Sequence, residues 1–390
     1  MYFQILDNKK ECYAIYCDSE LYYYPNSLEL TKTWGWASHV PDVADCAEMW
    51  SNGATLKQAC PEHLKEDLEH IQEKGMAFLK AFSSAKICLE DVCFYDLVPK
   101  KYLLDYCDIK NKISEYVFEH YKKPANYEFQ IALAKLLNKI SSRNISISDK
   151  PIKGLTIPER KKRQQAKYLN RIVYNQWGSK TGRLTTKPNS FPILTLPKSL
   201  RSMVVPNNDL FVELDYNSAE ARVVLALSGQ PQPKTDIHEH VRSEVYNNKY
   251  TRDETKQKVF AWLYNSKAQN KKLSSYIDKE NLLKKYYSDG IVSSPFNRQM
   301  KVENEKALNY LIQSTASDMF LRQAIKIDKL LEGTKSEIAF CVHDSLVLDM
   351  SKEDKSLLEE IIKIFKETDL GEFRVNASIG KSFGSMREIL

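Results

Sequence analysis

Apolar residues follow strand-like and helix-like spacings in different parts of the chain. The polar segment 142–158, which contains Pro and Gly, reads as a loop, and the segment 177–206, rich in Gly, Pro, Ser and Thr, is expected to form short strands that lead to 209–215. A chain of 390 residues is too long for one ordinary core, so we expect two or three subdomains. The pattern predicts, in chain order, a β-hairpin or meander at 2–24, helices at 60–83, 101–141 and 159–176, a strand at 209–215, mostly helices at 216–288, a turn at 290–296, a long helix at 301–332, a β-hairpin at 336–350, a helix at 352–366 and a C-terminal strand.

Two of the apolar strand-like runs each contain an aspartate. Asp215 ends the run 209–215, and Asp344 lies at the tip of the predicted hairpin 336–350. A carboxylate in such a place is costly unless something pairs with it, and two carboxylates brought together repel each other. Divalent cations would remove this cost, and two cations held in this way form a phosphoryl-transfer site.

Charge is distributed unevenly along the chain. Residues 1–100 carry a net charge of −7, which leaves +13 for residues 101–390 of a total of +6. Residues 150–201 contain 13 Lys and Arg but only one acid, Glu159. Such a stripe is typical of a polyanion-binding surface, and the alternative is a solvated helix face.

The cysteines and the apolar stretches argue for an intracellular protein. None of the eight cysteines forms a Cys-x-x-Cys pair, so paired zinc-finger spacing is absent and reduced thiols are expected. No stretch approaches the roughly 18 to 20 apolar residues that cross a bilayer, and the N-terminus lacks the pattern of a secretory signal. We therefore expect a cytoplasmic protein without a membrane partner.

A predicted helix between the two aspartates carries a cationic and aromatic face. Arg252, Lys256, Phe260 and Tyr264 follow one another at steps of four residues. Each step rotates by only about 40° around a helix, so the four side chains share one face. The cationic end suits a triphosphate and the aromatic end suits a base or a sugar. The alternative is an ordinary amphipathic surface helix.

Together these segments resemble family A DNA polymerases, the bacterial DNA polymerase I type. The motifs occur in the family's order over roughly residues 105–390. They are Thr-Gly-Arg-Leu-Thr-Thr from Thr181, Asp-Tyr-Asn-Ser-Ala-Glu-Ala-Arg from Asp215, Asp-Ile-His from Asp236, the Arg252–Tyr264 face, the Asn309–Asp318 segment and His343-Asp344.

The resemblance implies roles for individual residues. Asp215, Asp344 and the backbone carbonyl of Tyr216 would hold two Mg²⁺ ions, for which Mn²⁺ is expected to substitute. Lys256 would protonate the leaving pyrophosphate, and Glu220 would act as a steric gate against a ribose 2′-hydroxyl. The nucleotide-binding set is Arg252, Lys256, Phe260, Tyr264, Glu220 and His238. The DNA-binding set is Arg183, Asn309, Gln313 and His343, joined by Lys161, Lys162 and Arg163 of the basic stripe.

The same resemblance implies an α+β fold with a right-hand architecture. An antiparallel sheet would form the palm, and helices would form the fingers and thumb, next to a small N-terminal α/β region. The implied parts are an N-terminal region of unknown role at 1–100, a thumb at 101–176, a first part of the palm at 177–235, fingers at 236–319 and a second part of the palm at 320–390. The implied activity is template-directed extension of a primer 3′-hydroxyl with dNTPs, so the expected partners are primer–template DNA and dNTPs.

The chain departs from the family pattern at several positions. The family usually has Glu directly after the His-Asp of its last motif, where this chain has Ser345. This change puts the outer shell of the metal site in doubt and leaves a single-subunit RNA polymerase open as an alternative. Asn265, Ser314 and Glu305 also replace usual family residues. A non-catalytic primer–template-binding subunit is the other alternative.

The N-terminal region is short for a 3′–5′ exonuclease domain. Asp18-Ser19-Glu20 has the Asp-x-Glu form of an exonuclease signature, but its place in the predicted hairpin favours a turn. We therefore expect no intrinsic proofreading, a separate exonuclease or processivity factor as a further partner, and a phage-like origin.

Single residues also have plainer interpretations. Asp215 alone could be a helix N-cap, and His343 alone could be a core histidine. Tyr102 and Tyr106 are expected to be core residues rather than groups that stack on DNA.

Overall fold

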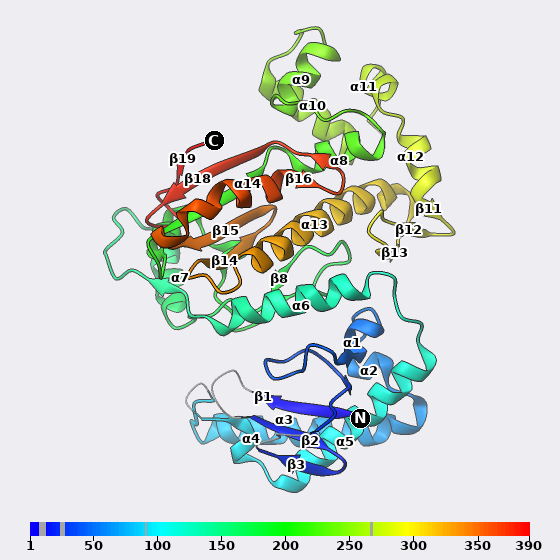
Figure 1. Ribbon diagram of the computed structural model, residues 1–390, viewed down its shortest axis with the longest axis vertical. Helices are drawn as coiled ribbons and strands as arrows, with labels where there is room; N and C mark the ends of the chain where they lie inside the picture. Colours follow the sequence, from blue (N-terminus) through cyan, green and yellow to red (C-terminus); the bar gives the residue numbers. More distant parts are fainter. Residues whose placement is uncertain (8–12, 24–27, 90–91, 266–267) are drawn as a thin grey trace. The chain divides into compact units, whose positions relative to one another are not determined.

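The structure is a computed structural model that describes residues 1–7, 13–23, 28–89, 92–265 and 268–390 (Figure 1). The chain divides into two compact units, Met1–Asn138 and Lys139–Leu390. This division falls inside the segment 101–176 for which the sequence predicts a thumb. The helix α6 (Tyr127–Ser142) contains the boundary.

The first unit begins with a small antiparallel sheet. Its strands β1 (Phe3–Asp7), β2 (Tyr13–Cys17) and β3 (Glu20–Tyr22) confirm the predicted β-meander. Asp18 and Ser19 have φ angles of 48° and 63°, the left-handed pair that a tight two-residue hairpin turn requires. The Asp-x-Glu segment therefore forms a hairpin turn, as predicted.

Helix α5 (Lys100–His120) contributes to the core of this first unit. Its buried residues Tyr102, Cys107 and Ile113 belong to the same apolar cluster as Leu6 and Leu68, and Tyr106 packs against that cluster. Both tyrosines are thus core residues, as predicted. The remaining elements of the unit are β4 (Lys32–Thr33), β5 (Asp45–Cys46), α1 (Ala47–Trp50), α2 (Leu56–Ala59), the 3₁₀ helix η1 (Glu62–Leu64), α3 (Lys65–Ser84) and α4 (Phe94–Leu97).

The cysteines only partly match the expectation of reduced thiols. Six are free, namely residues 17, 46, 60, 88, 107 and 341. Cys93 is disulfide-bonded, so the expectation is wrong for this residue. The spacing of cysteines along a chain does not reveal which of them meet in the fold, which is why the sequence missed this bond.

The second unit is built on a five-stranded antiparallel sheet in the order β14-β15-β10-β18-β19. Its strands are β10 (Leu210–Tyr216), β14 (Glu337–Val342), β15 (Ser345–Met350), β18 (Val375–Gly380) and β19 (Arg387–Glu388). The central strand β10 pairs with β15 on one side and with β18 on the other. The two aspartate-bearing segments, distant in sequence, are therefore neighbours in the sheet.

The two faces of β10 differ in polarity because side chains alternate along a strand. Val212, Leu214 and Tyr216 are fully buried, whereas Glu213 and Asp215 are half-buried on the opposite face. The Tyr216 ring stacks on Phe365 of α14 (Leu358–Lys366) at 4.3 Å between ring centroids. Helix α14 therefore packs against the apolar face of β10, and Glu213 and Asp215 project from the opposite face.

The other predicted elements of the second unit are largely present. The long helix is α13 (Asn304–Leu330), but the basic helix α7 (Ile157–Lys167) ends nine residues earlier than the predicted 176. The predicted turn at 290–296 is part of a three-stranded sheet, because Asp289 and Gly290 both adopt positive φ and close a tight hairpin. The further elements are β6 (Ser146–Ile147), β7 (Tyr174–Asn175), β8 (Thr185–Thr186), η2 (Ile193–Thr195), η3 (Lys198–Met203), β9 (Val204–Val205), α8 (Ala219–Leu227), α9 (Ile237–Glu244), α10 (Arg252–Tyr264), α11 (Lys271–Tyr276), α12 (Lys279–Tyr286), β11 (Tyr287–Ser288), β12 (Ile291–Ser293), β13 (Gln299–Lys301), η4 (Lys352–Leu357), β16 (Glu367–Thr368) and β17 (Gly371–Glu372).

Within the described residues, no helix has both the length and the apolar character needed to cross a membrane.

Candidate active site

Asp215 and Asp344 meet at one end of the five-stranded sheet. Asp215 lies opposite Ser345 in the β10–β15 register, and Asp344 directly precedes Ser345 in the hairpin turn. The turn is tight because His343 adopts a φ of 58°. Burial, and then the negative charges of Asp344 and Glu213, raise the pKa of Asp215 to about 7. The fold therefore brings Asp215 and Asp344 close enough for their charges to repel each other.

Glu220 and Arg183 border this pair of aspartates. Glu220 lies in the first turn of α8, and its carboxylate forms an ion pair with the half-exposed Arg183. Burial raises the pKa of Glu220, Arg183 lowers it, and the charge of Asp344 raises it again. The predicted steric gate and the predicted DNA contact are thus joined to each other, within electrostatic reach of Asp344.

The face predicted between residues 252 and 264 lies on a single helix, α10. A capping box at Thr251 and Glu254 fixes its start, just before Arg252. The rings of Phe260 and Tyr264 are stacked at 5.9 Å between centroids, with an interplanar angle of 10°. The Tyr264 hydroxyl is buried and has no hydrogen-bond partner among the described residues.

Arg252 is already paired in this structure. Its guanidinium makes two hydrogen bonds to Asp236, at 2.7 and 3.2 Å. The Asp236 carboxylate also caps α9 by accepting from the backbone N–H groups of His238 and Glu239. A triphosphate at Arg252 would therefore have to share or replace the Asp236 partner. Lys256, one turn further along α10, is exposed.

His238 lies under the cationic face rather than on it. Its side chain is fully buried, and burial lowers its pKa to about 4, so the ring is neutral at pH 7. The Nε2 atom shares a 3.0 Å hydrogen bond with Ser218 Oγ, whereas Nδ1 has no hydrogen-bond partner within the described part of the chain. Its contact with a triphosphate stays a prediction.

Three residues that the sequence analysis missed join the aspartate end to the α9–α10 region. Ser218 bonds His238, and Asn217 donates to Asp236 at 3.0 Å. Arg222 is fully buried and donates to the backbone carbonyls of residues 217, 233 and 235. An arginine directly before the apolar run 223–227 was the available signal, because a buried guanidinium must be hydrogen-bonded.

A buried ion pair supports the loop that carries Arg183. Arg298 makes two hydrogen bonds to the fully buried Asp318 of α13, at 2.9 and 2.7 Å. Gly182 has a φ of 76°, and a Cβ atom there would come within 2.6 Å of the Arg298 guanidinium. Only glycine satisfies both conditions, so the Gly182 loop packs directly on this ion pair. The sequence analysis did not identify Arg298.

Residues 273–385 match the family model described as DNA polymerase family A. The predicted resemblance to family A DNA polymerases is confirmed. Over 244 residues the chain is 24% identical to DNA polymerase I of Caldicellulosiruptor bescii, an alignment that covers 49% of this chain and 29% of that protein. Over 274 residues it is 25% identical to the thermostable DNA polymerase I of Thermus aquaticus, covering 55% of this chain and 32% of that protein.

A solved structure of the polymerase domain of M. smegmatis Pol1, in complex with DNA primer-template and dNTP, has a similar fold. The TM-score is 0.59 at 13% identity, over 73% of this chain and 76% of that chain. At this identity the similarity concerns the fold, which here is α+β. The chain spans less than a third of the length of the DNA polymerase I of Caldicellulosiruptor bescii.

The remaining residues that the family A resemblance assigns to DNA are spread over several elements. Asn309 lies near the start of α13 and donates to the Tyr264 carbonyl at 3.4 Å, which connects it to the α10 face. Gln313 is half-buried one turn further on, and His343 is exposed beside Asp344. Their contacts with DNA stay predictions.

The three basic residues predicted on the 159–176 helix differ in their surroundings. Lys161 and Lys162 of α7 are exposed. Arg163 is half-buried and donates to the backbone carbonyls of Asp149 and Lys150, so its guanidinium also holds the preceding loop. The two lysines are therefore the freer cations of this set.

The donor set at Asp215 and Asp344 fits hard divalent cations. Both groups offer oxygen, and among the described residues no ion pair connects either carboxylate to a cationic side chain. No group of three or more His, Cys, Asp or Glu side chains in the described part of the chain could hold a metal ion. The remaining oxygens would have to come from backbone, water or phosphate, as is usual for Mg²⁺.

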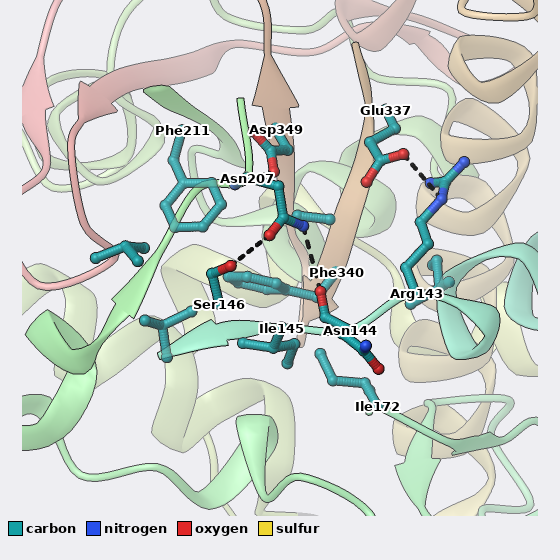
Figure 2. A pocket seen from close by; sticks show the side chains of 14 residues that line it. Arg143, Asn144, Ile145, Ser146, Ile172, Asn207, Phe211, Glu337, Phe340 and Asp349 are labelled. Carbon is teal, nitrogen blue, oxygen red and sulfur yellow. Dashed lines mark hydrogen bonds and ion pairs between the residues drawn. The ribbon is translucent and has the colours of Figure 1, made fainter. Parts of the chain in front are cut away.

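Two cavities lie away from the aspartate pair. Figure 2 shows the smaller one, at the other end of the sheet, where Asn207 bonds Ser146 and Arg143 pairs with Glu337. Its volume of about 20 Å³ admits roughly one water molecule. A larger cavity of about 530 Å³ adjoins Tyr264 and Asn309, between α10, α11, α12 and α13.

Proposed function

We propose that this chain is a DNA-directed DNA polymerase that extends a primer 3′-hydroxyl with dNTPs. One observation carries the proposal: Asp215 and Asp344 converge at one sheet end in a chain whose residues 273–385 match the family A model. The basic stripe at 150–201 and the α10 face supply surfaces suited to DNA and to a nucleotide. Primer–template DNA and dNTPs are accordingly the proposed partners.

The right-hand architecture belongs to this proposal. The five-stranded sheet with α8, α13 and α14 would be the palm, and α9 to α12 would be the fingers. The thumb would be drawn from residues 101–176, although the compact-unit boundary after Asn138 divides that segment.

Within this mechanism, two Mg²⁺ ions would lower the pKa of the primer hydroxyl and neutralise charge on the triphosphate. Asp215 and Asp344 would hold them, and Mn²⁺ would be expected to substitute. The Tyr216 carbonyl is the proposed third protein ligand. The stacked and hydrogen-bonded Tyr216 side chain, which donates to the Phe365 carbonyl at 2.7 Å, fixes the backbone at that point.

The chain's own side chains would position the triphosphate and move one proton. The primer 3′-hydroxyl would give its proton to water, and its oxygen would bond to the α-phosphorus as the bond from that phosphorus to the bridging oxygen breaks. Lys256 is exposed and would give its proton to the departing pyrophosphate. Arg252 would bind the phosphates in exchange for part of its pairing with Asp236. Phe260 and Tyr264 would form the wall for the base and sugar.

Sugar selection separates this proposal from a single-subunit RNA polymerase. Glu220 would close the space that a 2′-hydroxyl needs, and its ion pair with Arg183 holds it in place. Ser345 favours the RNA polymerase alternative, because single-subunit RNA polymerases of the same superfamily also carry His-Asp-Ser. Phe260 favours DNA synthesis, since an RNA polymerase needs a partner for the 2′-hydroxyl.

Primer extension with dNTPs or rNTPs on one primed template tests the proposal. Preferred use of dNTPs is expected, and preferred use of rNTPs would replace it with the RNA polymerase alternative. A second primer with a mismatched 3′ end tests the proposed lack of proofreading. Removal of the mismatched nucleotide would contradict that part alone.

Asp344→Ala separates an enzyme from a non-catalytic DNA-binding subunit. The variant is expected to lose extension while it retains primer–template binding, because its carboxylate serves the cations rather than the DNA. Asp369→Ala is a matched control, since Asp369 is exposed and pairs only with Lys326 in the described network. Equal extension by the wild type and Asp344→Ala would favour the binding-subunit alternative.

A further inference from the structure

Ser345 occupies the position where the family pattern has a carboxylate. It lies directly opposite Asp215 and next to Asp344, and its side chain is buried. The Ser345 hydroxyl donates a 2.7 Å hydrogen bond to Oε1 of Glu213. The side chain at position 345 therefore binds a carboxylate, that of Glu213, on the neighbouring strand β10.

Glu213 lies on the acidic face of β10. It precedes Asp215 by two residues, so both side chains project from the same face of the strand. Its charge acts on Asp215, which places the two carboxylates within electrostatic range of each other. Within the described residues, the one hydrogen bond to the Glu213 carboxylate comes from Ser345.

A purely structural role explains this arrangement poorly. A half-buried carboxylate that projects beside Asp215 adds to the repulsion that Asp215 already has from Asp344. A glutamine at 213 would accept the same hydrogen bond from Ser345 without that cost. The negative charge is therefore the property that needs an explanation, and a cation at Asp215 and Asp344 would benefit from it.

We propose that Glu213 supplies, from strand β10, the acidic group that the family pattern places at position 345, and that Ser345 holds it there by a hydrogen bond. This inference rests on the proposed function. Glu213 would be a positioning residue that strengthens cation binding by Asp215 and Asp344. It is not itself assigned as a ligand, because the described acids do not form a three-residue metal cluster.

An exchange of the two side chains tests the proposal. The variants are Glu213→Gln, Ser345→Glu, and the double variant Glu213→Ser with Ser345→Glu. Glu337→Gln is the control, since Glu337 is a half-buried carboxylate of the same sheet that pairs with Arg143 at the other end. Two quantities are measured: Mg²⁺ binding to the DNA-free protein by calorimetry, and the Mg²⁺ concentration that gives half-maximal primer extension.

Glu213→Gln is expected to weaken Mg²⁺ binding by about tenfold, since groups behind metal ligands typically contribute 10- to 100-fold. Thermal unfolding of the metal-free variant should show no loss of stability. Ser345→Glu should also be impaired, because it would put two carboxylates at hydrogen-bond distance. The exchanged double variant should bind Mg²⁺ at least several-fold more tightly than Glu213→Gln, and Glu337→Gln should match the wild type.

Unchanged Mg²⁺ binding in Glu213→Gln would overturn the proposal, and so would a double variant no better than either single variant. The calorimetric readout separates this inference from the proposed function. A wild type that binds Mg²⁺ but extends no primer would refute the polymerase, while the effect of Glu213→Gln on Mg²⁺ binding would still decide the role of Glu213.

Discussion

The two ends of the five-stranded sheet treat their carboxylates differently. At one end, Asp349 is almost fully buried and accepts backbone N–H bonds from Asn207 and Asn208 at 2.7 and 2.9 Å, beside the Arg143–Glu337 ion pair (Figure 2). At the other end, the negative charge of Asp344 raises the pKa of Asp215, and among the described residues neither carboxylate has a cationic partner. Asp349 and Glu337 at the first end have hydrogen-bond or ion-pair partners, whereas Asp215 and Asp344 at the second end have none among the described residues.

This contrast separates a structural carboxylate from a functional one on the same strands. Strand β15 begins beside Asp344 and contains Asp349, so the position of an acid on this strand does not by itself reveal its role. The distinction lies in the partners. A buried acid with its hydrogen bonds satisfied stabilises the fold, and a pair of acids that repel each other indicates a site for cations.

The largest expected difference concerns activity. Asp344→Asn should reduce single-turnover primer extension by at least about 1000-fold, since it removes a proposed ligand of the catalytic cations. Glu337→Gln, at the opposite end, should leave extension of the folded protein within about twofold of the wild type. Rapid-quench assays at saturating DNA measure both. Similar losses in the two variants would erase the contrast between the sheet ends.

For stability, the substitution at the Asp349 end of the sheet should have the larger effect. Asp349→Ala leaves the partly buried backbone N–H groups of Asn207 and Asn208 without their acceptor, which should cost roughly 1 to 3 kcal/mol of unfolding free energy. The same change should not alter the activity of the fraction that remains folded. Urea unfolding of the variant beside Glu372→Ala, an exposed acid of β17, provides the measurement and its control. A loss no greater than that of the control would show that Asp349 is not a structural acid.

The pH dependence of stability should reveal the repulsion at Asp215. Its pKa is raised in the folded state, so the protonated form is favoured there. Its contribution to stability is therefore fully present below about pH 4 and is lost as the pH rises through about 7. Asp215→Asn resembles the protonated form and should exceed the metal-free wild type by roughly 1 to 3 kcal/mol at pH 8, allowing for partial exposure.

At pH 4, Asp215→Asn and the metal-free wild type should have nearly equal stability. Chemical unfolding in the presence of a chelator, at pH 4, 6 and 8, measures the difference. A constant difference across this range, or a less stable variant at pH 8, would mean that Asp215 carries no such penalty.

The smallest effect is expected away from the sheet, on α7. Lys161→Ala combined with Lys162→Ala should weaken primer–template binding several-fold. The slope of log K against log salt concentration should become less steep by up to about one unit for each phosphate contact that is lost. Fluorescence anisotropy over a series of salt concentrations measures the slope. An unchanged slope would place the DNA-binding surface elsewhere on the chain.

The sequence predicted those features that depend on local pattern. Period-two runs located β10 and the β14–β15 hairpin, and steps of four residues located the α10 face, so the convergence of Asp215 and Asp344 was accessible before the fold was known. The turn at Asp18 and Ser19 was accessible for the same reason.

Features that depend on pairing across the fold were not accessible. The Asp236–Arg252 and Arg298–Asp318 ion pairs join residues 16 and 20 positions apart, and no periodicity encodes such contacts. The complete burial of His238 depends on Ser218 and on α10 packing above it, so the histidine looked like a surface ligand in the sequence. Glu213 was overlooked because an acid in an alternating strand reads as a solvent-facing residue.

Cation binding in the absence of DNA tests the central claim most directly. Thermal unfolding with and without Mg²⁺, at pH 7.5, should show clear stabilisation of the wild type by the metal. Asp215→Asn and Asp344→Asn should lose most of that stabilisation, while Glu337→Gln should retain it at the other end of the sheet. A wild type that Mg²⁺ does not stabilise, or aspartate variants that respond as the wild type does, would contradict the assignment of this sheet end as the cation site.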